Sequence, residues 1–190
     1  MEGKKFDPKK LEKLNNKKRL KDIPPEFIRK AVGLVNVETL VDIGAGTGLF
    51  SLALLNEFKC KTVYACDVSD IMIDWMKENI VTKHTEIIPL KSDEVKVPLP
   101  DNTADLVIMM NLHHELDEPE LILKDAFRVL KKGGKILIID WKKVEMNEGP
   151  PLGMRVCPED VKKQLSAGGF ENIQVIDGLE KHFTVTGDKR

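Results

Sequence analysis

The sequence predicts an α/β fold, in which a parallel sheet is covered by helices on both faces. Strand-like and helix-like segments alternate along the chain, which is typical of successive βαβ units. The strand-like runs LVIMM and ILIID, within 104–110 and 134–140, are apolar on both faces. Strands of parallel sheets read this way because helices bury them from both sides. An antiparallel sheet with one solvated face would alternate apolar and polar residues instead.

The first segment, residues 1–21, is basic, with nine Lys/Arg and three acids. Asp7 followed by Pro8 is typical of a helix start, and Leu11 and Leu14 share one face, so a short amphipathic helix is expected. Two interpretations stay open. The helix packs on the domain as a solvated element, or it is a lid that closes over a ligand. The side chains that would form the lid are Phe6, Leu11, Leu14 and Arg19.

The remaining elements follow in order. Pro24-Pro25 opens a helix with an apolar face. Strands are expected at 39–43, 61–66, 85–90, 104–110 and 134–140. Helices are expected at 47–58, 69–81, 118–130 and 158–168. In the tail, 172–178 and 182–187 predict an antiparallel hairpin at the sheet edge. We expect a single domain over 1–190, with a helical cap at 1–25 and an α/β core at 26–190; the one long loop is 141–157.

The composition is that of an ordinary globular protein, with 42% hydrophobic and 32% charged residues. Thirty basic and 31 acidic side chains create no field that would attract nucleic acid or an anionic membrane. Cys60, Cys66 and Cys157 have no disulfide or zinc spacing, so no metal is expected. No apolar run approaches the roughly 18 residues of a membrane span, and the first ten residues lack a signal-peptide core. The sequence therefore predicts a cytoplasmic protein, a monomer or homodimer, without nucleic-acid or membrane partners.

The most informative stretch is LVDIGAGTGLF, where Gly44, Gly46 and Gly48 lie between a buried strand and a helix. Glycine lets the backbone turn sharply and lets a ligand come close where a Cβ would block it. The N–H groups at the start of the following helix favour a negatively polarised or hydroxyl-rich ligand. A nucleoside-containing cofactor at the carboxyl ends of the strands is therefore expected.

Three acids indicate which nucleoside. The spacing G-x-G-x-G differs from the dinucleotide pattern G-x-G-x-x-G, and Asp42 stands two residues before the first glycine, where it suits an ammonium group rather than a pyrophosphate. Asp67 ends the second strand and can accept from both ribose hydroxyls, and Asp93 can accept from an adenine amine. Together these groups indicate S-adenosylmethionine. The other residues expected at this site are Ala45, Val68, Ser92, Glu94 and Asn111.

The motifs VDIGAGTG, CDVS, KSDEVKVPLPDNTADLVIMMNLHHEL and FRVLKKGGKILIID follow one another over about 37–141. In this order the chain resembles the class I S-adenosylmethionine-dependent methyltransferases, especially their small-molecule branch. The resemblance implies a Rossmann-like, doubly wound seven-stranded sheet of order 3-2-1-4-5-7-6, with strand 7 antiparallel. It also implies that the three glycines surround the methionine part of the cofactor, Asp67 the ribose and Asp93 the adenine. The chain departs from the pattern at Ala104 and Lys132, which are not expected to touch the cofactor.

Candidate catalytic residues follow the fourth and fifth strands. His113 and His114 come after the fourth strand, where the resemblance places the methyl group, and Asp140 ends the fifth. Histidine titrates near neutrality and can act as a base, but a polar wall or a helix start is an equally simple role. Methyl transfer requires mainly alignment and exclusion of water, so a base is needed only when the acceptor carries a proton.

Candidate substrate contacts lie in the long loop. Trp141 offers a flat wall, and Arg155 can hold an anionic group. The alternative is a rigid surface loop with an incidental ion pair. The opening FDPKKLEKL and the DWK…GPP…R segment resemble those of a group of small methyltransferases. Arsenite methyltransferases bind their metalloid through thiols, but the three cysteines of this chain are not expected to converge.

The sequence therefore predicts a methyltransferase that moves a methyl group from S-adenosylmethionine to a small-molecule acceptor by in-line displacement, leaving S-adenosyl-L-homocysteine. Two alternatives remain. A non-catalytic module would bind S-adenosylmethionine without turnover, and an NAD-dependent oxidoreductase would bind NADH despite the missing glycine spacing.

Overall fold

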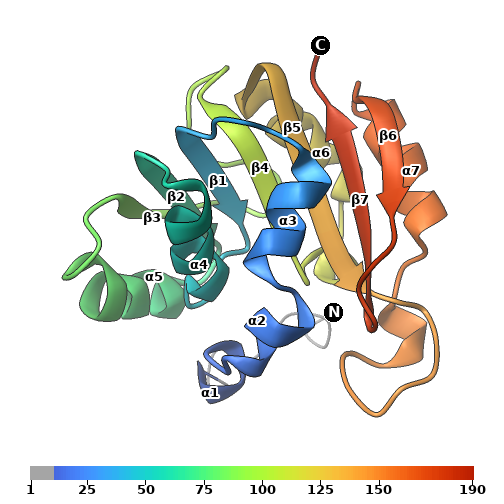
Figure 1. Cartoon of the computed structure of the whole chain (residues 1–190), viewed down its shortest axis with the longest axis horizontal. Helices are drawn as coiled ribbons and strands as arrows, with labels where there is room; N and C mark the ends of the chain where they lie inside the picture. The colour runs from blue at the N-terminus through green and yellow to red at the C-terminus, as the bar shows by residue number, and fades with distance from the viewer. Residues whose placement is uncertain (1–10) are drawn as a thin grey trace.

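A computed structural model describes residues 11–190, which form a seven-stranded sheet with helices on both faces (Figure 1). The strands are β1 Thr39–Ile43, β2 Thr62–Asp67, β3 Ile87–Lys91, β4 Ala104–Met110, β5 Leu130–Trp141, β6 Glu171–Ile176 and β7 His182–Asp188. The helix start expected at Asp7-Pro8 and the lid residue Phe6 lie outside the described residues.

The sheet order is β3-β2-β1-β4-β5-β7-β6. The strands β1 to β5 pair in parallel, whereas β7 runs antiparallel to both of its neighbours. The predicted order and the reversed seventh strand are thereby confirmed. The β5 strand begins at Leu130, four residues before the expected position 134, with a register shift against β4. Gly133 in this stretch has a φ of +81°, and its left-handed backbone accommodates the irregularity.

The helices agree with the expected rhythm. They are α1 Leu11–Leu14, α2 Lys18–Asp22, α3 Pro25–Val32, α4 Leu49–Phe58, α5 Asp70–Met76, α6 Pro119–Val129 and α7 Pro158–Ala167. The helix expected over 69–81 is divided, because its last turn is a π-helix, η1, at Lys77–Val81. Proline occupies the first turn of α3, α6 and α7, where its missing N–H costs no hydrogen bond. No helix within residues 11–190 combines the length and apolar character needed to cross a membrane.

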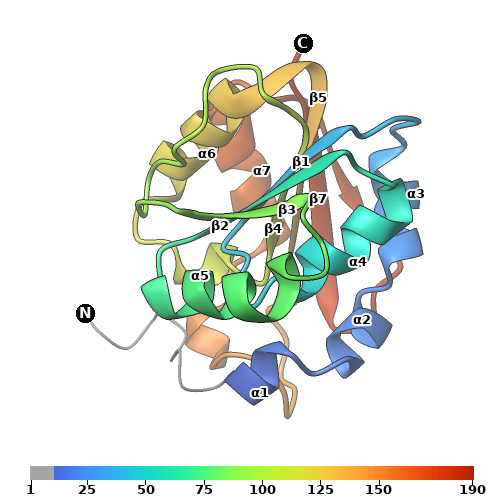
Figure 2. The same cartoon turned by 90° about the vertical axis from the view of Figure 1, so that its left-hand side faces the viewer.

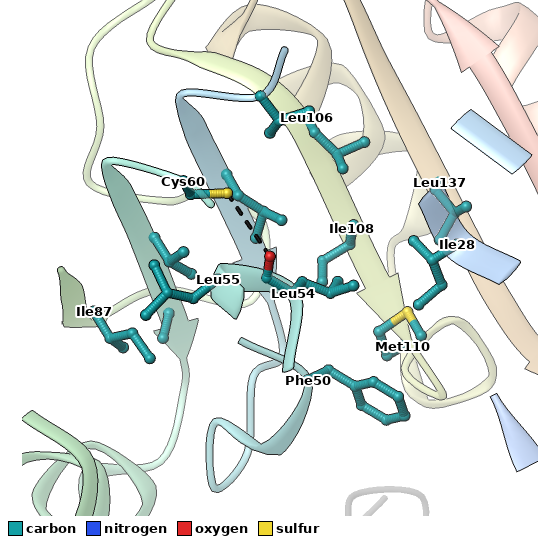
Figure 3. Close-up of a cluster of buried hydrophobic side chains, with 14 of the residues drawn as sticks. Ile28, Phe50, Leu54, Leu55, Cys60, Ile87, Leu106, Ile108, Met110 and Leu137 are labelled. Atoms are coloured by element: carbon teal, nitrogen blue, oxygen red, sulfur yellow. Dashed lines mark hydrogen bonds between the residues drawn. The ribbon is translucent and has the colours of Figure 1, made fainter. Parts of the chain in front are cut away.

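Helices cover both faces of the sheet (Figure 2). A hydrophobic cluster lies on each face. Neighbouring residues of β4 show the division, because Ile108 packs with α3, α4 and α5 whereas Val107 packs with α6 and α7. This alternation follows from the period of two in a strand. Figure 3 shows the first cluster, where Leu54 of α4 lies over the sheet near Ile108. Helices on both faces leave the carboxyl ends of the parallel strands as the natural place for a ligand.

Leu54 supplies a test of this packing, because its side chain is fully buried. Leu54→Ala is expected to lower the free energy of unfolding by about 2–5 kcal/mol, through lost burial and the cavity left behind. Leu121→Ala on α6 is the matched control; Leu121 is 45% exposed, and its loss is expected to stay within about 0.5 kcal/mol. Urea denaturation of both variants measures the difference, and equal losses would contradict the placement of Leu54.

Candidate active site

A cleft opens at the carboxyl ends of β1, β2 and β4. Ten of the eleven expected cofactor residues line it: Asp42, Gly44, Ala45, Gly46, Asp67, Val68, Ser92, Asp93, Glu94 and Asn111. Ser92 is buried, whereas Asp93 and Glu94 are exposed. Gly48 is the residue of this set that does not line the cleft. Side chains that lie far apart in the sequence are therefore gathered at the strand ends, as the topology requires.

The glycine loop between β1 and α4 uses its glycines for two different purposes. Gly44 has a φ of +73°, and a Cβ there would lie 2.7 Å from the Leu112 side chain. Gly48 has a φ of +74°, and a Cβ there would lie 2.9 Å from Ile80 Cδ1 of η1. Gly44 thus leaves room for the Leu112 side chain of the cleft wall, while Gly48 allows the loop to pack against η1. Gly48 thus has a packing role, and the cofactor contact expected of it stays a prediction.

Asp67, at the end of β2, holds the loop in place. Its Oδ2 accepts a hydrogen bond from the Gly46 N–H at 2.7 Å, and its Oδ1 accepts one from the Ser69 N–H at 2.8 Å. Burial raises the pKa of Asp67, and these N–H groups oppose that rise. A carboxylate has about four acceptor positions, so it can hold both amides and still accept from ribose hydroxyls.

Asp42 lies deeper in the cleft with an incomplete set of partners. Its Oδ2 accepts from the Ser51 hydroxyl at 2.6 Å, while its Oδ1 is buried and has no hydrogen-bond partner within residues 11–190. Burial raises the pKa of Asp42 to about 7, and the charge of Asp67 raises it further, whereas Ser51 and Arg19 lower it. A buried acceptor without a partner fits the ammonium group of an amino-acid cofactor.

Arg19 of α2 brings a cation to the rim of this cleft. Its Nη1 donates to the Leu14 carbonyl at 2.9 Å, and its guanidinium lies 5.0 Å from the centre of the Phe50 ring. Burial lowers the pKa of Arg19, and the charge of Asp42 opposes that shift. Leu14 and Arg19, which the sequence indicated as lid residues, both line the cleft. This geometry favours the lid interpretation for residues 11–22.

Several lining residues were not singled out from the sequence. They are Ile43, Phe50, Ser69, Met72, Val95, Met110, Leu112, Glu115, Leu116, Asp117, Glu118 and Ile122. Most are apolar residues at the ends of helices and strands, where nothing in the sequence distinguishes a cleft wall from the core. For Leu112 and Glu115, the sequence offered one indication of a place in the cleft, which was their position directly after the fourth strand.

Asn111 and the two histidines follow β4. Asn111 has a φ of +55°, uncommon for a residue other than glycine, and its Oδ1 is buried without a partner within the described chain. His113 does not line the cleft; its Nε2 lies 2.7 Å from Gln164 Oε1 of α7, and burial lowers its pKa. The catalytic role expected for His113 therefore stays a prediction, and its observed contact joins the segment after β4 to α7.

His114 and Asp140 form a buried pair at the ends of β4 and β5. Asp140 accepts from His114 Nδ1 at 2.8 Å, from the His114 backbone N–H at 3.0 Å and from the Trp141 N–H at 2.7 Å. Since an ionised carboxylate only accepts, the tautomer that fits this contact has its proton on Nδ1, which leaves Nε2 as an acceptor when the ring is neutral. That Nε2 lies 3.7 Å from Glu115 Oε1, and Glu115 lines the cleft.

Trp141 and Arg155 lie in or beside the long loop, away from the cleft lining. Arg155 is buried, and its guanidinium donates to the carbonyl oxygens of Lys142, Val144, Glu148 and Pro150. Arg155 thus braces the loop, and the anion contact expected of it stays a prediction. Trp141 is half-buried and packs on His182, with ring centres 4.3 Å apart. The substrate contact expected of Trp141 stays a prediction.

The sheet order, the glycine loop after β1 and the acids at the ends of β1 and β2 define a class I S-adenosylmethionine-dependent methyltransferase. Residues 41–138 match the family model for the methyltransferase domain. This match spans slightly more than half of the 190 residues, and the chain belongs to that family.

Relatives agree with this assignment. The crystal structure of a SAM-dependent methyltransferase from Aquifex aeolicus is 36% identical, with a TM-score of 0.88 over 96% of this chain and 98% of that chain. A mitochondrial 2-methoxy-6-polyprenyl-1,4-benzoquinol methylase of Caenorhabditis elegans is 29% identical over 55% of this chain. An arsenite methyltransferase of Halobacterium salinarum is 25% identical over 80% of this chain. The chain spans only 38% and 41% of the length of these last two relatives.

Asp67 supplies the first test of the cofactor side. Asp67→Ala is expected to weaken binding of S-adenosylmethionine by about 1.5–3 kcal/mol, the scale of hydrogen bonds to a charged group. Asp70→Ala is the matched control, because Asp70 is exposed and forms an ion pair with Lys91 outside the cleft. Calorimetric titration measures both variants, and unchanged affinity in Asp67→Ala would remove Asp67 from the site.

The raised pKa of Asp42, about 7, predicts a proton-linked affinity. Below that pH Asp42 is protonated and neutral; above it the carboxylate is free to attract a cationic cofactor. Binding should therefore tighten as the pH rises from about 6 to 8 and should release a proton near pH 6.5. Calorimetry in buffers of different ionisation enthalpy measures this release. Asp42→Asn is the control that subtracts the ligand's own titration, and the same proton release in that variant would exclude Asp42 as the source.

Proposed function

We propose that this chain transfers the methyl group of S-adenosylmethionine to a small-molecule acceptor that carries an ionisable proton. The observation that carries the proposal is that one cleft joins the glycine loop and Asp67 at one end to the segment after β4 at the other. A cofactor held by the first and an acceptor placed beside the second would share a single cavity. Such a geometry serves displacement, because the two reacting groups are held in contact and in line.

When bound, S-adenosylmethionine supplies a methyl group on a sulfonium centre. The thioether that remains after transfer, S-adenosyl-L-homocysteine, is a good leaving group. The chain's own contribution is then alignment, exclusion of water and removal of the acceptor's proton. Leu14 and Phe50 cover the cleft with apolar surface, and Arg19 closes its rim. These residues come from two separate segments, so the cover depends on α1 and α2 packing over the strand ends.

We propose His114 as the final proton acceptor, reached through Glu115, because His114 itself does not line the cleft. Asp140 holds the imidazole by Nδ1 and leaves Nε2 as the proton acceptor. Glu115 approaches Nε2 and also lines the cleft, so it connects the acceptor's side of the cavity to the base. The arrangement follows the general pattern of a base oriented by a third group.

The names of two relatives support a choice of acceptor class. One of them is named as a benzoquinol methylase, and a hydroxylated ring is a small molecule with an ionisable proton. The arsenite relative suggests thiol chemistry, which this chain does not support. Cys60 packs in the cluster beside α4 and Cys66 in the cluster beside α6, on opposite faces of the sheet, and burial raises the pKa of both thiols. We therefore favour a hydroxylated aromatic ring over a metalloid.

The first experiment separates catalysis from binding alone. The protein is incubated with S-adenosylmethionine labelled in its methyl group and with 1,4-dihydroxybenzene, phenethylamine or thiophenol, which offer oxygen or carbon, nitrogen and sulfur. Transfer to the dihydroxybenzene, measured as label in the organic product, is the expected result. Tight cofactor binding without transfer to any of the three would favour the non-catalytic module, and binding of NADH in its place would favour the oxidoreductase.

His114 supplies a second test of the proposal. His114→Ala is expected to lower kcat for 1,4-dihydroxybenzene by about 10²–10⁴-fold, the usual contribution of a positioned base. Cofactor affinity should stay within about twofold, because His114 does not line the cleft. His84→Ala is the matched control, since His84 lies in the turn before β3, remote from the cleft lining. Equal losses of turnover and cofactor affinity would contradict the division into donor and acceptor sides.

A further inference from the structure

The face of β7 beside Trp141 carries buried polar side chains without partners. His182 is 3% exposed, and neither of its ring nitrogens has a hydrogen-bond partner within residues 11–190. The Thr184 hydroxyl, two residues along the same face, is likewise buried and without a partner there. Buried polar groups are nearly always hydrogen-bonded, so two such side chains on one face mark a candidate place for a polar ligand.

The chemistry of His182 indicates what it would bind. Burial lowers its pKa to about 4, with Asp140 and Asp22 opposing this shift and Arg19 and Lys181 adding to it. Near neutral pH the ring is uncharged, so it has one N–H donor and one nitrogen acceptor. A hydroxyl group, which both donates and accepts, matches that pair. The Thr184 hydroxyl adds the same dual capacity beside it.

The surroundings hold the His182 ring in a fixed orientation. His182 pairs with Trp141 across the β5–β7 ladder, and their rings are tilted by 43° at 4.3 Å. Gly149 packs so closely against Trp141 that a Cβ at this position would lie 2.7 Å from the indole. A ring packed this way is preorganised, so a hydrogen bond from it discriminates between ligands at a small entropic cost.

The position of His182 suits an acceptor that also reaches the cleft. In the sheet, β5 separates β7 from β4, and Asn111 follows β4 at the cleft. Strand spacing of about 4.8 Å places the backbones of the two residues roughly 10 Å apart across the sheet, although His182 itself does not line the cleft. Asp140, which holds His114, lies next to Trp141 on the strand between them.

A network of ion pairs lies beside this face. Glu148 of the 141–157 loop forms ion pairs with Lys18 of α2 and with Lys181 before β7, and Lys181 also reaches Asp22. Lys18 and Glu148 are about half exposed, 53% and 43%, so the pair between them is screened by water and weak. Separation of α2 from this network would require breaking both the Lys18–Glu148 pair and the less exposed Lys181–Asp22 pair.

We propose that His182, with Thr184 beside it, is a specificity-determining residue that hydrogen-bonds a hydroxyl group of the methyl acceptor. The inference rests on the proposed function only in taking the ligand to be the acceptor. It predicts that a hydroxyl remote from the methylated atom decides which small molecules bind.

The experiment observes binding without turnover. Protein labelled with ¹⁵N in its histidine rings is saturated with S-adenosyl-L-homocysteine and titrated with 1,4-dihydroxybenzene or with 1,4-dimethoxybenzene. The diol should shift the His182 nitrogen signals saturably, and the dimethoxy compound, which cannot donate, should bind at least about tenfold more weakly. The signals of His182 are assigned from their loss in His182→Phe.

The variants make the result decisive. His182→Phe keeps a ring on Trp141 but removes both nitrogens, and it should weaken binding of the diol at least about tenfold. His182→Gln keeps a donor and an acceptor and should recover most of that loss. Thr186→Val, farther along the same face of β7, is the matched control and should bind the diol like the unaltered protein. Affinity for S-adenosyl-L-homocysteine should be unchanged in all three.

Three results would overturn the inference: no saturable binding of the diol, binding that leaves the His182 signals unmoved, or equal affinity in His182→Phe. Binding that depends on His182 but is followed by no methyl transfer would support the inference while refuting the proposed chemistry. The two proposals therefore fail separately.

Discussion

The glycine loop depends on its hydrogen bonds to the end of β2. The Cys66 carbonyl accepts from the Gly44 and Ala45 N–H groups at 2.9 and 3.0 Å, and the Asp67 carboxylate accepts from Gly46. Three successive amides are thus turned toward the neighbouring strand, which requires left-handed backbone in the loop. The position of α4 depends on this turn, because the helix begins where the turn ends. Ser51 of α4 then donates its hydroxyl hydrogen bond to Asp42.

On the other half of the sheet, the segment after β4 is held in a similar way by hydrogen bonds to a carboxylate. Asp140 collects three N–H groups, two of them from His114 and one from Trp141, so it ties the segment after β4 to the end of β5. Arg155 braces the loop that follows by donating to four carbonyl oxygens. Buried carboxylate and guanidinium groups are tolerated here because each is surrounded by partners.

Several buried polar atoms that have no hydrogen-bond partner within residues 11–190 lie near the candidate site. Those of Asp42 and Asn111 lie at or directly after the carboxyl ends of β1 and β4, and those of His182 and Thr184 lie in the first half of the antiparallel β7. A core optimised for stability alone would pair or replace such groups, since each costs free energy when left unpaired. Their retention is consistent with a surface shaped for ligands, with the cofactor at β1 and the acceptor toward β7.

The sequence by itself determined the α/β fold class, the positions of the strands and the glycine loop with Asp42 and Asp67, because these depend on local patterns. Apolar runs specify buried strands, and a glycine turn works wherever strand and helix meet. Only the tertiary structure decided the roles of Gly48, Arg155 and His182. Gly48 contacts η1, Arg155 contacts carbonyls within its own loop, and His182 meets Trp141 across two strands. Such roles depend on contacts between residues that lie far apart in the sequence. The type and spacing of side chains along the chain do not reveal those contacts.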